Sequence, residues 1–224
     1  MPLLASQTTA SMSSLCTARH AAEHLYPWSV DDLFPTPDHR LPLIGYGSLM
    51  NLASARRSLS AECLASAKPV IVLGARRIYE YVMSPRGRGV YGEAVAHDQF
   101  GVLNAQATGD RADWFNAMMF QMSVDDIPAL LSRESAYDLV PAWTLCWNGE
   151  APQPSIGYFF SCRRDSYDGR QLLDSQILPH PGYHAICEEG CEAISPEFLH
   201  AFRTTTWARQ ARLIDAVDPQ AEST

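Results

Sequence analysis

Two short segments of the sequence combine residue types that could carry out acid–base chemistry on a small molecule. In the first, Ile127, Leu130 and Leu131 lie seven, four and three residues before Glu134, on one face of a predicted helix. A carboxylate that extends such an apolar stripe is desolvated, and desolvation raises its pKa toward the range of a general base at neutral pH. Glu134 is therefore a candidate general base. The alternative is a structural ion pair with an arginine at the helix end.

The second segment is a glycine-rich turn, Gly45, Tyr46, Gly47, Ser48 and Leu49, at the end of an apolar run. Two glycines and a serine in this position allow successive backbone N–H groups to converge on one point and form an anion-binding nest. Such a nest suits a carboxylate or a developing oxyanion. The segment lacks the spacing of a phosphate-binding loop, and on its own such a motif is more often an ordinary tight turn.

The elements that must position these residues are predicted from apolar runs and turn-forming residues. The runs predict strands at residues 41–46, 68–82 with a bend at Gly74, 90–96, 102–107, 114–122, 139–147 and 156–161. Helices are predicted at residues 51–60, 123–134, 183–189 and 196–207, with a basic loop at 84–89. Since the strands are short, closely spaced and more numerous than the helices, we expect an α+β fold, a small mixed β-barrel with flanking helices.

Composition excludes some classes of partner. The chain of 224 residues carries a formal net charge of -8, which disfavours general attraction to nucleic acid or to anionic membranes. No run approaches the roughly 18 to 20 apolar residues of a spanning helix, and the six cysteines are scattered without the spacing of a disulfide framework. We therefore expect a cytoplasmic protein with reduced thiols and a small-molecule partner, without nucleic acid or membrane.

The chain is predicted to hold one domain between two less regular ends. Residues 1–39 are rich in Ser, Thr, Ala and Pro, and residues 1–22 contain no acidic side chain, so we expect a poorly ordered leader. A transit peptide is the alternative, although Arg19 is the lone arginine of this segment. The domain is expected at residues 40–210, followed by a polar tail at 211–224.

Taken together, the motifs resemble the gamma-glutamylcyclotransferase-like superfamily. The resemblance runs from about residue 41 to residue 207 and rests on segments in the family's order. They are the Tyr46 to Leu49 loop, the glycine bend in the next long strand, Val102 to Ala105, Phe120 to Ser123, and Leu130 to Tyr137, which contains the helix-end Glu134. The loop and the glutamate are weak signals separately and specific as a pair.

The resemblance implies a cavity at one end of the barrel, in which Tyr46, Gly47, Ser48 and Leu49 bind the γ-glutamyl part of the substrate. Glu134 would take a proton from the substrate α-ammonium, the amine would attack the γ-carbonyl, and 5-oxoproline would form as the amine portion leaves. Tyr137 would contact the substrate or orient Glu134, and its alternative role is an aromatic plug. The implied enzyme, an acyltransferase or lyase related to glutathione metabolism, needs no metal and no cofactor.

Several alternatives remain at this point. The sequence does not name the leaving amine or the oligomeric state, and a non-catalytic binding module on the same fold is the alternative function. Arg163, Arg164 and Arg170 could reach over the cavity and recognise a carboxylate. A zinc site is conceivable because four candidate ligands have helical spacing, although Pro181 and a helix end at Gly190 weaken it; they are His180, His184, Cys187 and Cys191.

Overall fold

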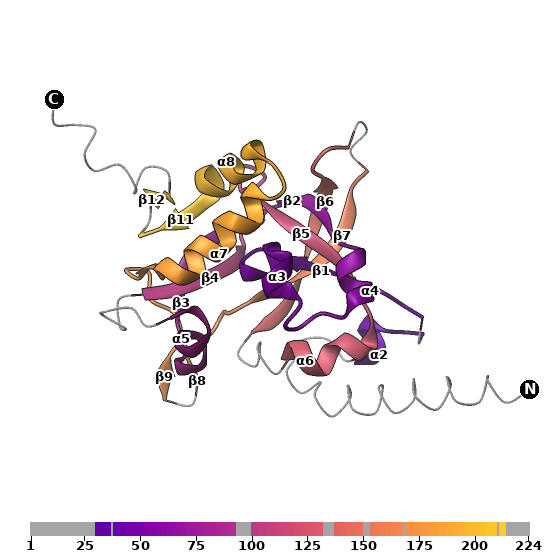
Figure 1. The fold of residues 1–224 in the computed structure, drawn as a ribbon, viewed down its shortest axis with the longest axis horizontal. Coiled ribbons are helices and arrows are strands. Elements are labelled where there is room, and N and C mark those ends of the chain that lie inside the picture. The colour runs from indigo at the N-terminus through magenta and orange to yellow at the C-terminus, as the bar shows by residue number, and fades with distance from the viewer. Residues whose placement is uncertain are drawn as a thin grey trace, which may run out of the picture.

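Five strands close into a small barrel at the centre of the fold (Figure 1). The computed structural model describes residues 30–36, 38–92, 100–131, 137–149, 153–167, 169–209 and 211–213. The barrel strands follow the order β1 (Leu41–Gly45), β5 (Trp114–Met122), β2 (Lys68–Leu73), β6 (Asp138–Cys146) and β7 (Ser155–Ser161). All neighbours are antiparallel except β1 and β7, which are parallel and close the barrel. This confirms the predicted mixed barrel.

A second sheet continues from the barrel. Its order is β10 (Leu178–Pro179), β4 (Phe100–Ala107), β3 (Ala75–Val82), β11 (Thr206–Ala208) and β12 (Ala211–Arg212), and β8 (Ser166–Tyr167) pairs separately with β9 (Arg170–Gln171). The predicted strand at residues 68–82 is divided at Gly74, which has a φ of +70° that favours glycine. Its two halves, β2 and β3, therefore belong to different sheets.

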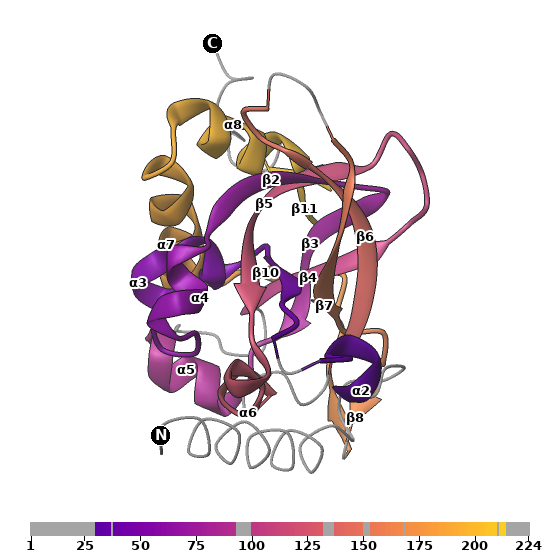
Figure 2. The same cartoon turned by 90° about the vertical axis from the view of Figure 1, so that its right-hand side faces the viewer.

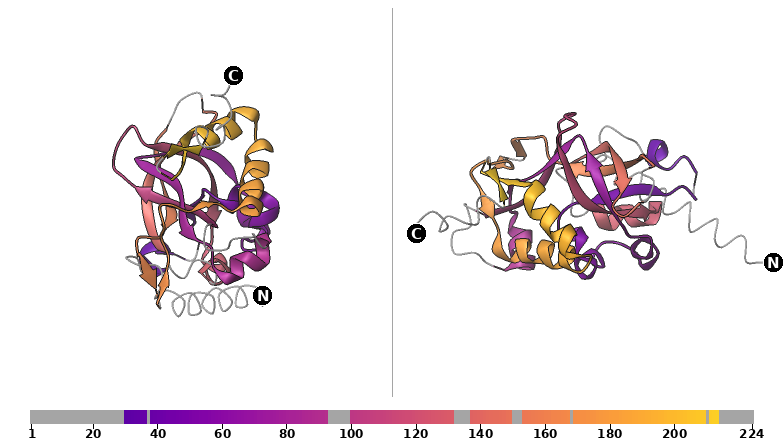
Figure 3. Two further views of the ribbon diagram at one scale, coloured as in Figure 1. Left: turned by 90° about the vertical axis from the view of Figure 1, so that its left-hand side faces the viewer. Right: turned by 90° about the horizontal axis from the view of Figure 1, so that it is seen from above.

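Helices cover the strands mainly on one side. In Figure 2, α3, α4, α5 and α7 lie to one side of the strands, and β6 and β7 lie on the other. In chain order the helical elements are α2 (Val30–Leu33), η2 (Ser48–Met50), α3 (Leu52–Ala55), α4 (Ala61–Ala65), α5 (Pro85–Tyr91), η4 (Val124–Asp126), α6 (Ile127–Leu131), α7 (Pro181–Glu192) and α8 (Pro196–Thr205). Figure 3 shows the late helices beside the early ones, and α7 packs directly on η2.

The region around residue 85 differs from the prediction. Residues 85–91 form helix α5 instead of a basic loop followed by a strand, and residues 93–99 lie outside the described part of the chain. The helix begins because the Ser84 hydroxyl accepts a hydrogen bond from the Gly87 N–H at 3.1 Å and because Pro85 occupies the first turn. These start signals outweigh the two glycines within the helix.

Arg77 on β3 is fully buried where the barrel, the second sheet and α8 meet. Its Nε donates to Thr206 Oγ1 at 2.8 Å, and its Nη1 and Nη2 donate to Asn116 O and Oδ1 at 2.6 and 2.9 Å. The guanidinium lies 4.2 Å from the centre of the Phe202 ring. Burial lowers the pKa of Arg77 to about 10. Arg77 is a structural cross-link between three parts of the chain.

The buried core includes residues on both sides of the span 40–210. Leu33 and Phe34 precede it and Leu213 follows it, and all three pack in the same hydrophobic cluster as the barrel strands. Most of the expected leader and tail, residues 1–29 and 214–224, lies outside the described residues, so the division into leader, domain and tail stays a prediction. Within the described part of the chain, no helix has both the length and the apolarity needed to cross a membrane.

Candidate functional site

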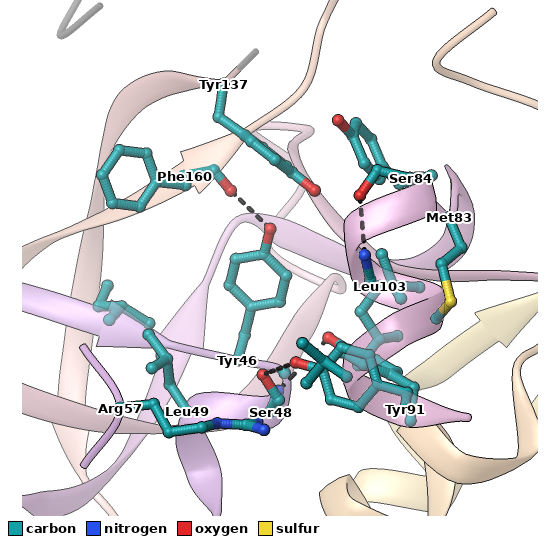
Figure 4. Close-up of a pocket in the computed structure, with 18 residues that line it drawn as sticks. Tyr46, Ser48, Leu49, Arg57, Met83, Ser84, Tyr91, Leu103, Tyr137 and Phe160 are labelled. Atoms are coloured by element: carbon teal, nitrogen blue, oxygen red, sulfur yellow. Dashed lines mark hydrogen bonds between the residues drawn. The ribbon is translucent and has the colours of Figure 1, made fainter. Parts of the chain in front are cut away.

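One pocket of about 270 Å³ lies where the end of the barrel meets the second sheet. Its wall includes the end of β1 and the following loop, Phe160 of β7, the ends of β3 and β4, helix α5 and Tyr183 of α7 (Figure 4). The volume is close to the lower limit of about 300 Å³ for small-molecule sites. The pocket therefore suits a ligand of dipeptide size.

The loop after β1 forms one wall of this pocket. The Tyr46 hydroxyl donates to the Phe160 carbonyl at 2.6 Å, and this hydrogen bond fixes the Tyr46 ring against strand β7 of the barrel. The hydroxyl of Tyr91 donates to Ser48 Oγ at 3.1 Å, which ties α5 to the loop. Ser48 is left with its own hydroxyl hydrogen, for which the described residues provide no acceptor. This hydroxyl can donate to a ligand in the pocket.

The predicted backbone nest is partly occupied by the protein. The Ser48 N–H donates to Tyr183 Oη at 3.3 Å, so this amide does not face an open site. Burial raises the pKa of Tyr183 well above its usual value, and the phenol therefore stays neutral. The residues of the strand end and loop that line the pocket are Gly45, Tyr46, Gly47, Ser48 and Leu49.

Two glycines allow α7 to approach the loop closely. A Cβ on Gly47 would overlap the Tyr183 hydroxyl, and a Cβ on Gly190 would collide with the backbone of Met50 and Asn51. Gly190 lies inside α7, which continues to Glu192, so its expected role as the end of the helix is wrong. Its physical role is close helix–loop packing. This packing brings Tyr183 to the pocket.

Tyr137 enters the same pocket from the start of β6. Its ring stacks on Tyr81 of β3 with centroids 4.8 Å apart, and Figure 4 shows its hydroxyl directed toward the interior of the pocket. Glu134, the predicted general base, falls within residues 132–136, outside the described part of the chain. The structure thus brings together Tyr137 and the other predicted substrate-binding residues, Tyr46, Gly47, Ser48 and Leu49, and its description stops short of Glu134.

The pocket also contains residues that the sequence did not indicate. Tyr91 and Tyr183 supply two of its aromatic walls, and Arg57 supplies the one charged side chain among the described lining residues. Tyr91 could not be assigned to the pocket from the sequence because helix α5 was not predicted. The pair Ser84 and Pro85, which starts this helix, is the pattern that could have indicated it. No local pattern marks Arg57, because its position depends on packing against α5.

The arginines considered as a lid have other partners. Arg163 Nε lies 3.1 Å and Arg164 Nη2 lies 3.5 Å from the carboxylate of Asp138. Arg170 is exposed on the short strand β9. None of these three lines the described pocket wall.

The four candidate zinc ligands are engaged in other contacts. His180 caps α7 by accepting from the Tyr183 N–H, and His184 Nδ1 lies 2.9 Å from the Tyr79 hydroxyl. Cys187 and Cys191 are fully buried, and burial raises the pKa of both thiols, that of Cys191 to about 12. Within the described residues, no three His, Cys, Asp or Glu side chains form a group that could hold a metal ion.

Comparisons with known proteins bear on the fold. No family model and no curated protein sequence matches this chain. The structure of YkqA from Bacillus subtilis aligns at 12% identity with a TM-score of 0.55, over 76% of this chain and 55% of YkqA. The chain therefore spans about half the length of that relative. This likeness shows that the chain has the α+β, gamma-glutamylcyclotransferase-like fold that the sequence resemblance implied.

Two solution structures from Arabidopsis thaliana also align. At5g39720.1 has 8% identity and a TM-score of 0.38, over 76% of this chain and 93% of its own. At3g28950.1 has 12% identity and a TM-score of 0.39, over 71% of this chain and 82% of its own.

Proposed function

We propose that the pocket is the active site of a gamma-glutamylcyclotransferase-type enzyme that releases 5-oxoproline from a small γ-glutamyl peptide or amine. The observation that carries this proposal is the position of Tyr137. It was selected from the sequence together with the Tyr46 to Leu49 loop, and both lie in the wall of one pocket although they are far apart in the chain. The fold and the size of the pocket agree with a substrate of this class.

In the proposed reaction Glu134 is the general base. It takes a proton from the α-ammonium group of the substrate, and the freed amine attacks the γ-carbonyl carbon. The new C–N bond closes a five-membered ring as the old amide C–N bond breaks. The attacking nitrogen loses two protons in all, the first to Glu134, and both are transferred to the leaving amine, which departs as an ammonium. Because the attacking amine is tethered to the carbonyl, the enzyme needs chiefly a base, an oxyanion donor and a fixed substrate conformation.

The described residues can supply the last two of these requirements. The Ser48 hydroxyl, which accepts from Tyr91, is the proposed donor to the γ-carbonyl oxygen as negative charge develops there. The aromatic walls hold the chain of the substrate bent and limit access of water. Glu134 precedes Tyr137 by three residues, a length of chain that spans at most roughly 11 Å. The length of this segment therefore allows Glu134 to reach the pocket.

A substrate panel tests the proposal. Purified protein is incubated with γ-glutamyl dipeptides, glutathione and γ-glutamyl amines, and 5-oxoproline and free amine are measured in the same samples. The matched control is the α-linked isomer of each dipeptide, in which the same atoms lack the γ-amide. We expect 5-oxoproline and amine in equal amounts from at least one γ-linked compound and none from its isomer. Absence of release from the whole panel contradicts the proposal and favours a binding module on the same fold.

A further inference from the structure

Arg57 is the one positive charge among the described residues of the pocket wall. It is exposed, and no carboxylate of the described residues pairs with it. The other described lining residues are aliphatic, aromatic, glycine, serine or methionine side chains. A negatively charged ligand group would complete its contacts.

Neighbouring residues hold the Arg57 guanidinium in place before any ligand arrives. Nη2 donates to Ser54 Oγ at 2.6 Å and Nε donates to the Ser54 carbonyl at 3.3 Å. Ser54 is itself fixed, because its N–H donates to Asn51 Oδ1 at the start of α3. The guanidinium also lies 5.6 Å from the centre of the Tyr91 ring. An arginine ordered in this way loses less conformational entropy when it binds a carboxylate.

Part of this guanidinium is free to donate. The printed sequence places no acidic residue within four positions of Arg57, and Nη1 has no hydrogen-bond partner among the described residues. Since Nη1 carries two N–H groups, it can bind one carboxylate oxygen while the Ser54 contacts stay intact. The protein thus fixes Nε and Nη2 of Arg57 through Ser54 and leaves Nη1 to bind a ligand.

We propose that Arg57 determines substrate specificity by binding the carboxylate of the leaving amine portion. This inference rests on the proposed function. Figure 4 shows Arg57 and Tyr137 on opposite sides of Tyr46, and the proposed base precedes Tyr137 in the chain. In the proposal, the γ-glutamyl part, whose α-amine and α-carboxylate share one carbon, lies at the Tyr137 end of the pocket. The far end holds the leaving portion, so the enzyme selects γ-glutamyl amino acids or peptides over γ-glutamyl amines without a carboxylate.

The test compares two substrates that differ by one charge, γ-glutamylalanine and γ-glutamylalaninamide. We expect the wild type to prefer the acid by about tenfold in kcat/KM, as expected for one charged hydrogen-bonding pair in a partly exposed site. Arg57→Gln should lower turnover of the acid about tenfold, to that of the amide, and lower turnover of the amide by much less. Arg57→Lys, which keeps the charge without the planar fork, should retain part of the preference.

Arg56→Gln is the matched control, because Arg56 is an exposed neighbour that does not line the pocket. It should leave the preference intact. Equal loss of turnover for both substrates in Arg57→Gln, or a wild type without preference, overturns the inference. If the wild type releases no 5-oxoproline at all, the proposed function fails, and calorimetric binding of the same two compounds then decides. Tighter binding of the acid that disappears in Arg57→Gln supports the role of Arg57, and any other binding result overturns it.

Discussion

Arg57 and Arg77 place the same side chain in two contrasting regions. Arg77 is fully buried, and all three of its guanidinium nitrogens donate to protein groups of β5, α8 and β11. Arg57 is exposed at the pocket, with Ser54 as its hydrogen-bond partner among the described residues. The difference teaches that a guanidinium whose donors the fold uses cross-links the structure, whereas one with a donor left free is available to a ligand, as we propose for Arg57.

The largest effect is expected from Arg77→Met. The substitution leaves the buried carbonyl and side-chain oxygen of Asn116 without these donors, at a cost of about 1–3 kcal/mol for each. We expect the free energy of unfolding to fall by roughly 3 kcal/mol or more, measured by chemical denaturation. Arg57→Gln is the control and should change it by less than about 0.5 kcal/mol. Similar losses in the two variants would remove the contrast.

A second test separates activity from stability at the pocket. Ser48→Ala removes the proposed oxyanion donor, and loss of one such donor typically lowers kcat by about 10²-fold. The free energy of unfolding should fall by only about 1 kcal/mol, since a single hydrogen bond with Tyr91 is lost. Tyr91→Phe removes the same hydrogen bond and keeps the serine, so it should retain most of the activity. If both variants lose equal activity, Ser48 acts through Tyr91 and not as the donor.

Gly47→Ala tests the close approach between the loop and α7. The added methyl group overlaps the Tyr183 hydroxyl, and overpacking of this kind costs about 1–3 kcal/mol. Tyr183→Phe removes the overlapping oxygen, so a double-mutant cycle should show that Gly47→Ala is less harmful in the phenylalanine background. Denaturation curves of the four proteins provide the measurement. Additive effects would show that the two groups are not in contact.

The smallest effect is expected on the pH dependence of the free energy of unfolding, through His184. Burial lowers the pKa of His184, while Glu188 on α7 raises it and Arg203 on α8 lowers it further. The unfolded state therefore binds a proton more readily, and the stability due to neutral His184 is present above about pH 6.5 and lost as pH falls through the folded pKa. His184→Gln should lose less stability than the wild type between about pH 7.5 and 5.5. An equal loss would exclude His184 as the source.

Much of the architecture follows from local sequence patterns. Apolar runs predicted the barrel strands within a residue or two, since β1 and β5 are almost continuously buried. Helix α8 begins at Pro196 as predicted, and the Ser195 side chain caps it by accepting from the Phe198 N–H. The division of residues 68–82 between two sheets was beyond such patterns. A bend at Gly74 is a local property, whereas the choice of sheet depends on pairing with distant strands.

The candidate site was only partly predictable for the same reason. The loop from Tyr46 to Leu49 and Tyr137 carry signals in their residue types, and they meet in one pocket. Gly190 has no positive φ and does not end the helix. It is needed because a side chain there would collide with the backbone of Met50 and Asn51. Arg57 packs on Tyr91, and Tyr91 lies on helix α5, which was not predicted because it contains two glycines. Neither residue could therefore be assigned to the pocket before the packing was known.

The central claim is that Glu134 acts as the base for a γ-glutamyl substrate in this pocket. The most direct measurement compares wild type and Glu134→Gln for both 5-oxoproline release and calorimetric binding of one γ-glutamyl substrate, with Glu192→Gln, an exposed residue at the end of α7, as the matched control. We predict that Glu134→Gln binds the substrate but loses turnover by about 10²-fold or more, while the control resembles wild type. Turnover that survives in Glu134→Gln would contradict the account.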